Sequence, residues 1–393
     1  MSEKPSEKPG ADWFMAEAEK ARGGNFELVP GMREQGKKIK KFYVESDYAP
    51  LKAVYLANAS GFHVPDMDIS WDAANMFAHN SPESKEYMRK HAGKFLGDAD
   101  PERFEKLVAE SDALAKAYRD NGVYVIRNES GVIPEEQITF AESWSGQKLV
   151  GTYAQAAWDV VGECLINFWE MSAEMAVEFQ AREAVVEFFR NDPSAKWMSM
   201  PFPVPTSWPD PGPRCSAGDI KLFSDKRIVW GIGVAEPSHM TDFTKARSSG
   251  DEFACEIFRR MVEPYGWTVD IVYFDSNYTY HLDCLLAPLK EGLLSYPKGS
   301  LWTPLPRGSR TGRLSTSVAV TTTSVARTMC RWVTTRSSSA KRPGNIARIW
   351  TRLGSKSSLL PTSISSTLSA AVYTARAPRF IASREQLEGM PGR

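Results

Sequence analysis

Two hydrophobic periodicities recur in a fixed order along the first three hundred residues. Apolar residues spaced three to four apart predict an amphipathic helix over residues 101–121, and Gly122 is expected to end it. The apolar run VYVIR at residues 123–127 predicts a strand directly afterwards. The same order returns with a helix at residues 250–265 and a strand at Thr268–Asp275. This repetition indicates β/α modules arranged around a centre, rather than one doubly wound sheet.

Other segments support an α/β protein. Apolar runs predict strands at residues 51–57 and Arg227–Val234, and a strand, a turn and a second strand over residues 281–297. The Ala-, Glu- and Met-rich stretch 171–190 predicts a helix that ends before an Asn-Asp-Pro sequence. Neither GxGxxG nor GxxxxGK[ST] follows a strand, which argues against a dinucleotide or P-loop site.

Charge divides the chain into two unlike parts, although the formal net charge is zero. Residues 1–291 hold 46 acidic and 32 basic side chains, a balance of −14, whereas residues 292–393 hold 2 and 16, a balance of +14. No acidic residue lies between Glu291 and Glu385. Such a Ser-, Thr- and Arg-rich tail is typical of a disordered segment, a nucleic-acid-binding tail or a wrong reading frame. It lacks the interleaved aromatic residues of single-strand binders, so nucleic acid is not the expected partner.

Composition therefore predicts four regions. A polar N-terminal arm is expected at residues 1–44, an α/β domain at 45–306, a frame-shifted or disordered basic tail at 307–382 and a short C-terminal remnant at 383–393. No apolar run is long enough to span a membrane, and the first residues lack the apolar segment of a signal peptide. The five cysteines form no CxxC pair, so we expect a cytoplasmic protein without a disulfide framework or a structural zinc site.

Three segments carry a resemblance to a known family. They are residues 46–66 (SDYAPLKAVYLANASGFHVPD), residues 151–189 with the following AKWMSMPFP, and residues 273–297 (YFDSNYTYHLDCLLAPLKEGLLSYP). Together they resemble the amidinotransferases, such as the glycine and inosamine-phosphate enzymes of the pentein superfamily. The resemblance implies a pentein propeller of ββαβ modules, with the C-terminal modules disrupted in this chain. It also implies that residues 45–306 are a catalytic domain that transfers an amidino group from L-arginine to an amine acceptor through a covalent amidino-cysteine. That reaction needs no metal or other cofactor, so none is expected.

That chemistry needs carboxylates to orient the planar guanidinium, a thiolate to attack its carbon, and a histidine to move protons. By resemblance, His281 is the acid and base. Asp283 lies two residues further on the same face of the predicted strand and would hold the guanidinium. Asp159 would be a second substrate carboxylate. The plain alternatives are a structural His-x-Asp motif and an aspartate that caps a strand end.

One acidic motif departs from the family pattern. The family shows two aspartates in a sequence similar to E-P-x-F-D-A-A-D-F, and this chain has AEPSHMTDF at residues 235–243. Asp242 matches the second aspartate, and the first, which pairs with the histidine, has no clear counterpart. Either His239 or a shifted loop fills that place, or the activity differs from that of typical members.

The nucleophilic cysteine of the family follows a Gly-rich turn near the C-terminus, and this chain has none there. Its last cysteine, Cys330, lies in TMCRW. Reading the tail one base earlier can yield Gly-Gly-Val-His-Cys, with the cysteine codon across Thr374 and Ala375.

We therefore predict a frame-shifted tail and an enzyme that is inactive as written. The alternatives are a guanidine hydrolase similar to arginine deiminase, and a non-catalytic pentein with a basic binding tail. The expected partners are two small-molecule substrates, arginine and an amine acceptor. A homodimer is compatible with the sequence, which does not specify an oligomeric state.

Overall fold

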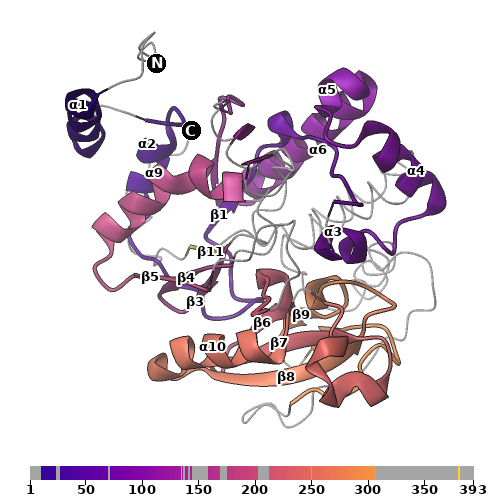
Figure 1. Ribbon diagram of the computed structural model, residues 1–393. Helices are drawn as coiled ribbons and strands as arrows, with labels where there is room; N and C mark the ends of the chain where they lie inside the picture. The colour runs from indigo at the N-terminus through magenta and orange to yellow at the C-terminus, as the bar shows by residue number, and fades with distance from the viewer. Residues whose placement is uncertain are drawn as a thin grey trace.

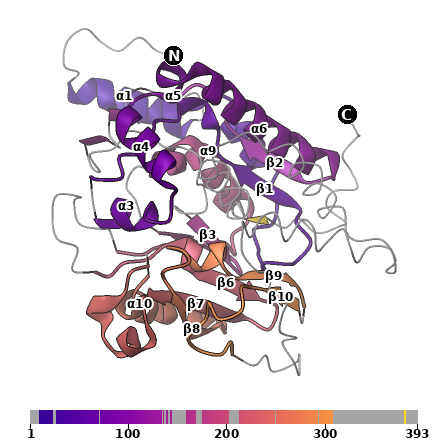
Figure 2. The same cartoon turned by 90° about the vertical axis from the view of Figure 1, so that its right-hand side faces the viewer.

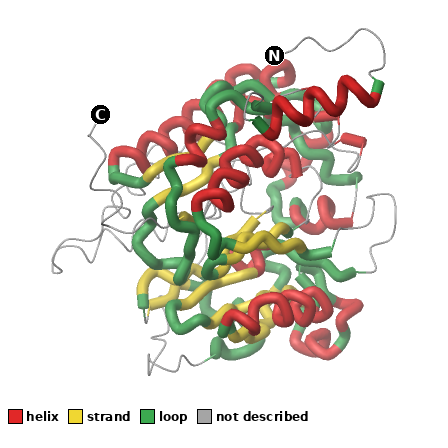
Figure 3. The backbone as a smooth tube through the Cα atoms, turned by 90° about the vertical axis from the view of Figure 1, so that its left-hand side faces the viewer, coloured by secondary structure: helices red, strands yellow, loops and turns green. Residues whose placement is uncertain are grey.

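The computed structural model describes most of the first 306 residues and one short strand beyond them. The described residues are 10–23, 27–69, 71–133, 135, 138–139, 142–143, 158–168, 175–201, 212–248, 250–291, 293–306 and 379–380. Strands gather in the interior of the body and helices lie outside them, which makes the chain a mixed α/β protein (Figures 1 and 3). No helix within these ranges is both long and apolar enough to cross a membrane.

The helices and strands are as follows. The helices are α1 (Ala11–Arg22), α2 (Met32–Lys37), α3 (Trp71–Met76), α4 (Pro82–His91), α5 (Leu96–Ala99), α6 (Pro101–Asp120), α9 (Met175–Asn191) and α10 (Glu252–Val262). The strands are β1 (Ala53–Leu56), β2 (Tyr124–Arg127), β3 (Trp158–Val161), β4 (Cys164–Asn167), β5 (Lys196–Ser199), β6 (Ile220–Phe223), β7 (Arg227–Val234), β8 (Thr268–Asp275), β9 (Ala287–Lys290), β10 (Leu293–Ser295) and β11 (Arg379–Phe380).

Three small sheets share one arrangement, in which a central strand has one antiparallel and one parallel neighbour. In the second, β3 and β4 form an antiparallel pair, and β5 returns through α9 to lie parallel to β4. In the third, β6 and β7 are antiparallel, and β8 returns through α10 parallel to β7. In the first, β2 lies parallel to β1, with α6 leading into β2, and β11 supplies the antiparallel neighbour of β1. The repeated modules predicted from the sequence are therefore present in the described sheets, but among the described residues these sheets are not seen to close into a propeller.

The predicted helix boundaries have identifiable caps. Asp100 accepts a hydrogen bond from Arg103 N at the start of α6, and Asp251 does the same for Ala254 N at the start of α10. Gly122 (φ 75°) and Gly266 (φ 83°) adopt the left-handed conformation between each of these helical segments and the following strand. Both predicted glycine stops are thus confirmed, and they aim each strand back along its sheet.

Large aromatic side chains join the second and third sheets. Trp230 on β7 and Phe258 on α10 are fully buried, with ring centroids 5.2 Å apart. Phe168, which follows β4, lies 5.9 Å from Phe258. Burying such a side chain contributes about 1.5–3 kcal/mol. Figure 2 shows the third sheet below the first, with β9 and β10 beside β6.

Two expectations need correction here. Residues 27–44, expected to belong to a polar arm, pack into the core, since Met32 and Phe42 are fully buried and α2 lies along α9.

Residues 281–297 contain the predicted hairpin, β9 paired antiparallel with β10, but His281 is not on a strand. It directly precedes a single 3₁₀ turn, η7 (Leu282–Cys284), so the same-face argument from strand periodicity fails for His281 and Asp283. Apart from β11, the predicted tail 307–382 and the remnant 383–393 lie outside the described residues.

A buried aspartate ties the end of α9 to the chain before β1, and it predicts an acid-sensitive fold. Asp192 Oδ2 accepts from Phe42 N (2.8 Å), and Oδ1 accepts from the Ser194 hydroxyl (2.6 Å). Burial alone would raise the pKa of Asp192, but these hydrogen bonds outweigh it, and the pKa is lowered. Its stabilising contribution is therefore fully present above about pH 4, the usual Asp pKa, and is lost as the pH falls through the folded-state pKa. Urea unfolding from pH 6 to pH 2 should show a smaller loss of stability in Asp192→Asn than in the parent chain, and equal losses would contradict this assignment.

Candidate functional site

The candidate site is built around His281, where two short turns meet. The first turn, η3 (Ala217–Asp219), leads into β6, and the second is η7. A methyl group placed on Gly218 would lie 2.5 Å from His281 Nδ1 and 2.9 Å from its Cγ. Because no side chain tolerates that distance, glycine is required for the imidazole to rest on this turn. The contact also places Nδ1 against the backbone and leaves Nε2 on the other side of the ring.

Asp219 joins the two turns. Its side chain is fully buried, and Oδ1 accepts a hydrogen bond from Leu282 N, the residue after His281 (3.1 Å). The Ser216 hydroxyl, also fully buried, accepts from Gly218 N at 3.0 Å and caps the first turn. A buried carboxylate thus holds the backbone immediately beside the candidate histidine.

Two further glycines permit close packing around the site, Gly231 against Leu282 and Gly250 against Asp219. A methyl group on Gly231 would lie 2.5 Å from Leu282 Cβ, so the second turn packs directly on the strand. A methyl group on Gly250 would lie 3.1 Å from Asp219 Oδ2 and from Trp230 Nε1. The close approach of backbone to side chain here is a tertiary requirement that residue periodicity does not reveal.

His281 and Asp283, both predicted from the sequence, lie on the same turn but differ in accessibility. His281 is partly exposed, and its ring meets Tyr280 edge to face at 4.8 Å. Asp283 is only 5% exposed, and its carboxylate raises the pKa of the neighbouring Cys284 thiol. Lys221 on β6 is buried behind the same turn, and its charge also acts on that thiol. The structure therefore brings one accessible imidazole together with two buried carboxylates, those of Asp219 and Asp283.

Asp159 and Asp242 have local partners. Asp159 is half-buried on β3, in another sheet, and its Oδ1 accepts from Val160 N (2.7 Å). Asp242 follows the turn η4 (Pro237–Thr241) and accepts from the Thr244 hydroxyl (2.6 Å), which lowers the Asp242 pKa. His239 in that turn forms its own contact, with Nε2 lying 2.8 Å from Glu236 Oε1.

The carboxylate that binds the His281 segment is Asp219, through Leu282 N. The sequence analysis did not identify this residue. The available signal was an acidic residue placed directly before the apolar strand β6.

The cysteines near or within the described sheets are not activated. Burial raises the pKa of Cys164 to about 11 and that of Cys255 to about 12. Burial and the neighbouring Asp283 raise the pKa of Cys284 well above its ordinary value. These three thiols are therefore protonated at neutral pH and are poor nucleophiles. Cys215 is buried, and both Cys330 and the predicted cysteine position at Thr374 and Ala375 lie outside the described residues.

Within the described ranges, no three His, Cys, Asp or Glu side chains are grouped so that they could hold a metal ion. What the site offers is an accessible imidazole for proton transfer and buried negative charge beside it. Such a combination suits a planar, delocalised cation, because carboxylates bind a guanidinium through paired hydrogen bonds.

No protein-family model matches the chain, and no curated protein does. Solved structures with a similar arrangement include the inosamine-phosphate amidinotransferase StrB1 from Streptomyces griseus, with 18% identity and a TM-score of 0.49 over 66% of this chain and 70% of that one. The amidinotransferase SxtG of saxitoxin biosynthesis from Microseira wollei has 16% identity and a TM-score of 0.48 over 67% and 70%. The N-terminal domain of ArgZ, an arginine dihydrolase from cyanobacteria, has 14% identity and a TM-score of 0.33 over 64% and 68%.

The solved structures to which the chain is similar are thus amidinotransferases and an arginine dihydrolase. None of them supports the frame-shift interpretation of residues 307–382, which stays a prediction.

Proposed function

We propose that the chain is an amidinotransferase-like protein of pentein fold, built to handle the guanidinium group of L-arginine, and that it is inactive as written. The observation that carries the proposal is the cluster at the two turns: His281 is accessible, and the Asp219 and Asp283 carboxylates are buried beside it. In the complete reaction, an amidino group passes from arginine to an amine acceptor.

The chemical roles follow from that cluster. Asp283, and Asp159 from another sheet, would hold the guanidinium, while Asp219 would position His281 through the Leu282 backbone. A thiolate would attack the guanidinium carbon and form a C–S bond as the C–N bond to the ornithine nitrogen breaks. His281 would donate a proton to that leaving nitrogen. The acceptor amine would then attack the same carbon, lose its proton to His281 and break the C–S bond. The raised pKa of Cys164, Cys255 and Cys284 supports the absence of the first step in this chain.

A guanidine hydrolase is the alternative enzyme. There the thiolate would attack the same carbon, ammonia rather than ornithine would leave with a proton from His281, and water would then attack that carbon and break the C–S bond to give citrulline. A non-catalytic pentein with a basic binding tail is the alternative without chemistry, and the protonated thiols of the described region favour it over an active enzyme.

Arginine binding and turnover test the proposal together. Calorimetry with the full chain should detect L-arginine binding that weakens about tenfold or more in Asp283→Asn, because a charged hydrogen-bonded contact is worth about 1.5–3 kcal/mol. Asp242→Asn is the matched control and should bind as the parent does, since Asp242 caps its own turn. Incubation with arginine and an amine should yield neither ornithine nor citrulline.

Each outcome has a distinct meaning. Absence of arginine binding would overturn the proposed function, and ornithine formation by the chain as written would overturn its inactivity. Citrulline with ammonia would select the hydrolase. Sequencing of the gene across codons 300–390 tests the frame separately: a lost or gained base there would restore the predicted cysteine, and a confirmed sequence would leave the non-catalytic protein.

A further inference from the structure

The backbone of His281 is anchored through both of its neighbours in the chain. Tyr280 before it is only 3% exposed, and Leu282 after it is fully buried. Leu282 N donates to the buried Asp219 carboxylate, and the Leu282 side chain packs on Gly231 of β7. His281 itself is extended (φ −116°, ψ 149°). Because the backbone is fixed on both sides, the side-chain torsions of His281 decide where its imidazole lies.

One edge of the imidazole rests on the first turn. A methyl group placed on Gly218 would have three nearest neighbours, all in His281: Nδ1 at 2.5 Å, Cγ at 2.9 Å and Cβ at 3.2 Å. Nε2 therefore lies farther from this turn than Nδ1 does. The turn is fixed in its own right, since the buried Ser216 hydroxyl accepts from Gly218 N at 3.0 Å. Gly218 thus covers the Nδ1 edge of the ring with a rigid surface.

The ring of Tyr280 is a second surface against the imidazole. The two ring centroids lie 4.8 Å apart at an interplanar angle of 86°, which is an edge-to-face arrangement. Tyr280 is buried and His281 is partly exposed, so the tyrosine ring is the more constrained partner of the pair. An edge-to-face contact is attractive because the positive edge of one ring meets the negative face of the other. Turning the imidazole out of this arrangement therefore costs energy.

We propose that Tyr280 is a positioning residue for His281. Its ring and Gly218 together hold the imidazole with Nδ1 against the first turn, and Nε2 is the nitrogen that carries out the proton transfers. That assignment of the proton transfers rests on the proposed function, in which His281 is the acid and base. The position of the ring itself does not depend on arginine chemistry.

Chemical modification of the full chain examines the two nitrogens of His281 separately. Diethyl pyrocarbonate transfers an ethoxycarbonyl group to an accessible neutral imidazole nitrogen, and a second transfer requires the other nitrogen to be accessible as well. Peptide fragmentation in a mass spectrometer locates both groups on His281. We expect mainly single modification in the parent chain. In Tyr280→Leu the ratio of doubly to singly modified His281 should rise roughly two- to tenfold, the range that one edge-to-face contact supports.

Two variants separate positioning from a general loss of packing. Tyr280→Phe keeps the ring and removes only the hydroxyl, so its ratio should equal that of the parent chain. Tyr278→Leu removes an exposed tyrosine (52% exposed) from the same segment, and it should also leave the ratio unchanged. Cooperative thermal unfolding of Tyr280→Leu establishes that the ratio is measured on folded protein. The parent chain provides a test of its own, since extensive double modification there would overturn the proposed arrangement.

The outcomes keep this inference apart from the proposed function. Equal ratios in the parent chain and Tyr280→Leu overturn the positioning role, and so does a ratio that rises as much in Tyr280→Phe as in Tyr280→Leu. A rise confined to Tyr280→Leu supports it. Calorimetry with L-arginine on the parent chain is the separate arm: absence of binding there overturns the proposed function, while the ratio still reports whether Tyr280 holds the ring.

Discussion

Replacing Glu187 with alanine is expected to lower the free energy of unfolding by about 3–5 kcal/mol, because removing one partner of a buried ion pair strands the others. Glu187 accepts from both Arg33 and Arg190, and both its side chain and that of Arg33 are buried between α2 and α9. Alanine would leave the Arg33 guanidinium at a packed helix interface without its counter-charge. Urea unfolding followed by circular dichroism measures the loss.

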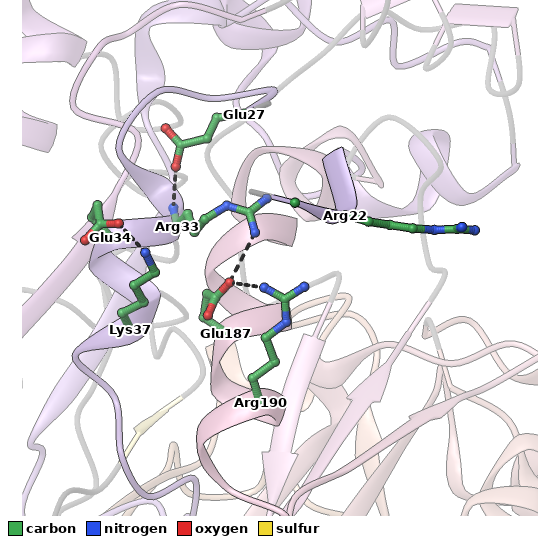
Figure 4. Close-up of a pocket in the computed structure, with 8 residues that line it drawn as sticks. Arg22, Glu27, Arg33, Glu34, Lys37, Glu187 and Arg190 are labelled. Atoms are coloured by element: carbon green, nitrogen blue, oxygen red, sulfur yellow. Dashed lines mark hydrogen bonds and ion pairs between the residues drawn. The ribbon is translucent and has the colours of Figure 1, made fainter. Parts of the chain in front are cut away.

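Two variants make this result diagnostic. Glu34→Ala removes an exposed carboxylate that pairs with Lys37 on α2 (Figure 4), and it should leave the free energy of unfolding nearly unchanged. The double variant Arg33→Met with Glu187→Leu removes both buried charges and should recover most of the lost stability, since apolar replacements of a buried pair are often neutral. Equal losses in Glu187→Ala and Glu34→Ala would show that burial does not control this interaction.

Local sequence patterns predicted the elements whose formation depends on neighbouring residues. The strands β7 and β8 have the predicted bounds, and α6 ends at Gly122 as the helical period and the glycine required. Helix periodicity, caps and glycine stops act within a few residues, so one sequence contains them. The strand predicted at residues 281–286 was wrong, because local patterns do not contain tertiary contacts. Its apolar run is typical of a strand, whereas the structure has a 3₁₀ turn there whose Leu282 packs against Gly231.

Only part of the candidate site could be predicted from the sequence. His281 and Asp283 are two positions apart, so a single short motif contains both. Asp219 lies 62 positions before His281 and meets the next residue, Leu282, only through a tertiary hydrogen bond at a separation of 63. Matching motif letters selected Asp242 instead, which forms its hydrogen bonds within its own turn. Contacts that depend on two turns meeting, and on glycines that permit the approach, have no local signature.

Asp219→Ala should therefore have a much larger effect than Asp242→Ala. Alanine at 219 leaves the buried Leu282 N–H without its acceptor and removes a fully buried carboxylate, so we expect the free energy of unfolding to fall by about 2–3 kcal/mol. Asp242→Ala loses only the hydrogen bonds to Thr244 at a partly exposed turn, so the free energy of unfolding should change much less than in Asp219→Ala. Urea unfolding compares the two directly.

Asp219→Asn separates positioning from packing. The amide keeps an oxygen that can accept from Leu282 N, so its stability should stay closer to that of the parent chain than in Asp219→Ala. If Asp219 also contributes negative charge to the guanidinium site, arginine binding should weaken in Asp219→Asn although the fold is retained. Unchanged arginine binding in a stable Asp219→Asn would restrict Asp219 to holding the turn beside His281, and equal stability losses in Asp219→Ala and Asp242→Ala would remove Asp219 from the site altogether.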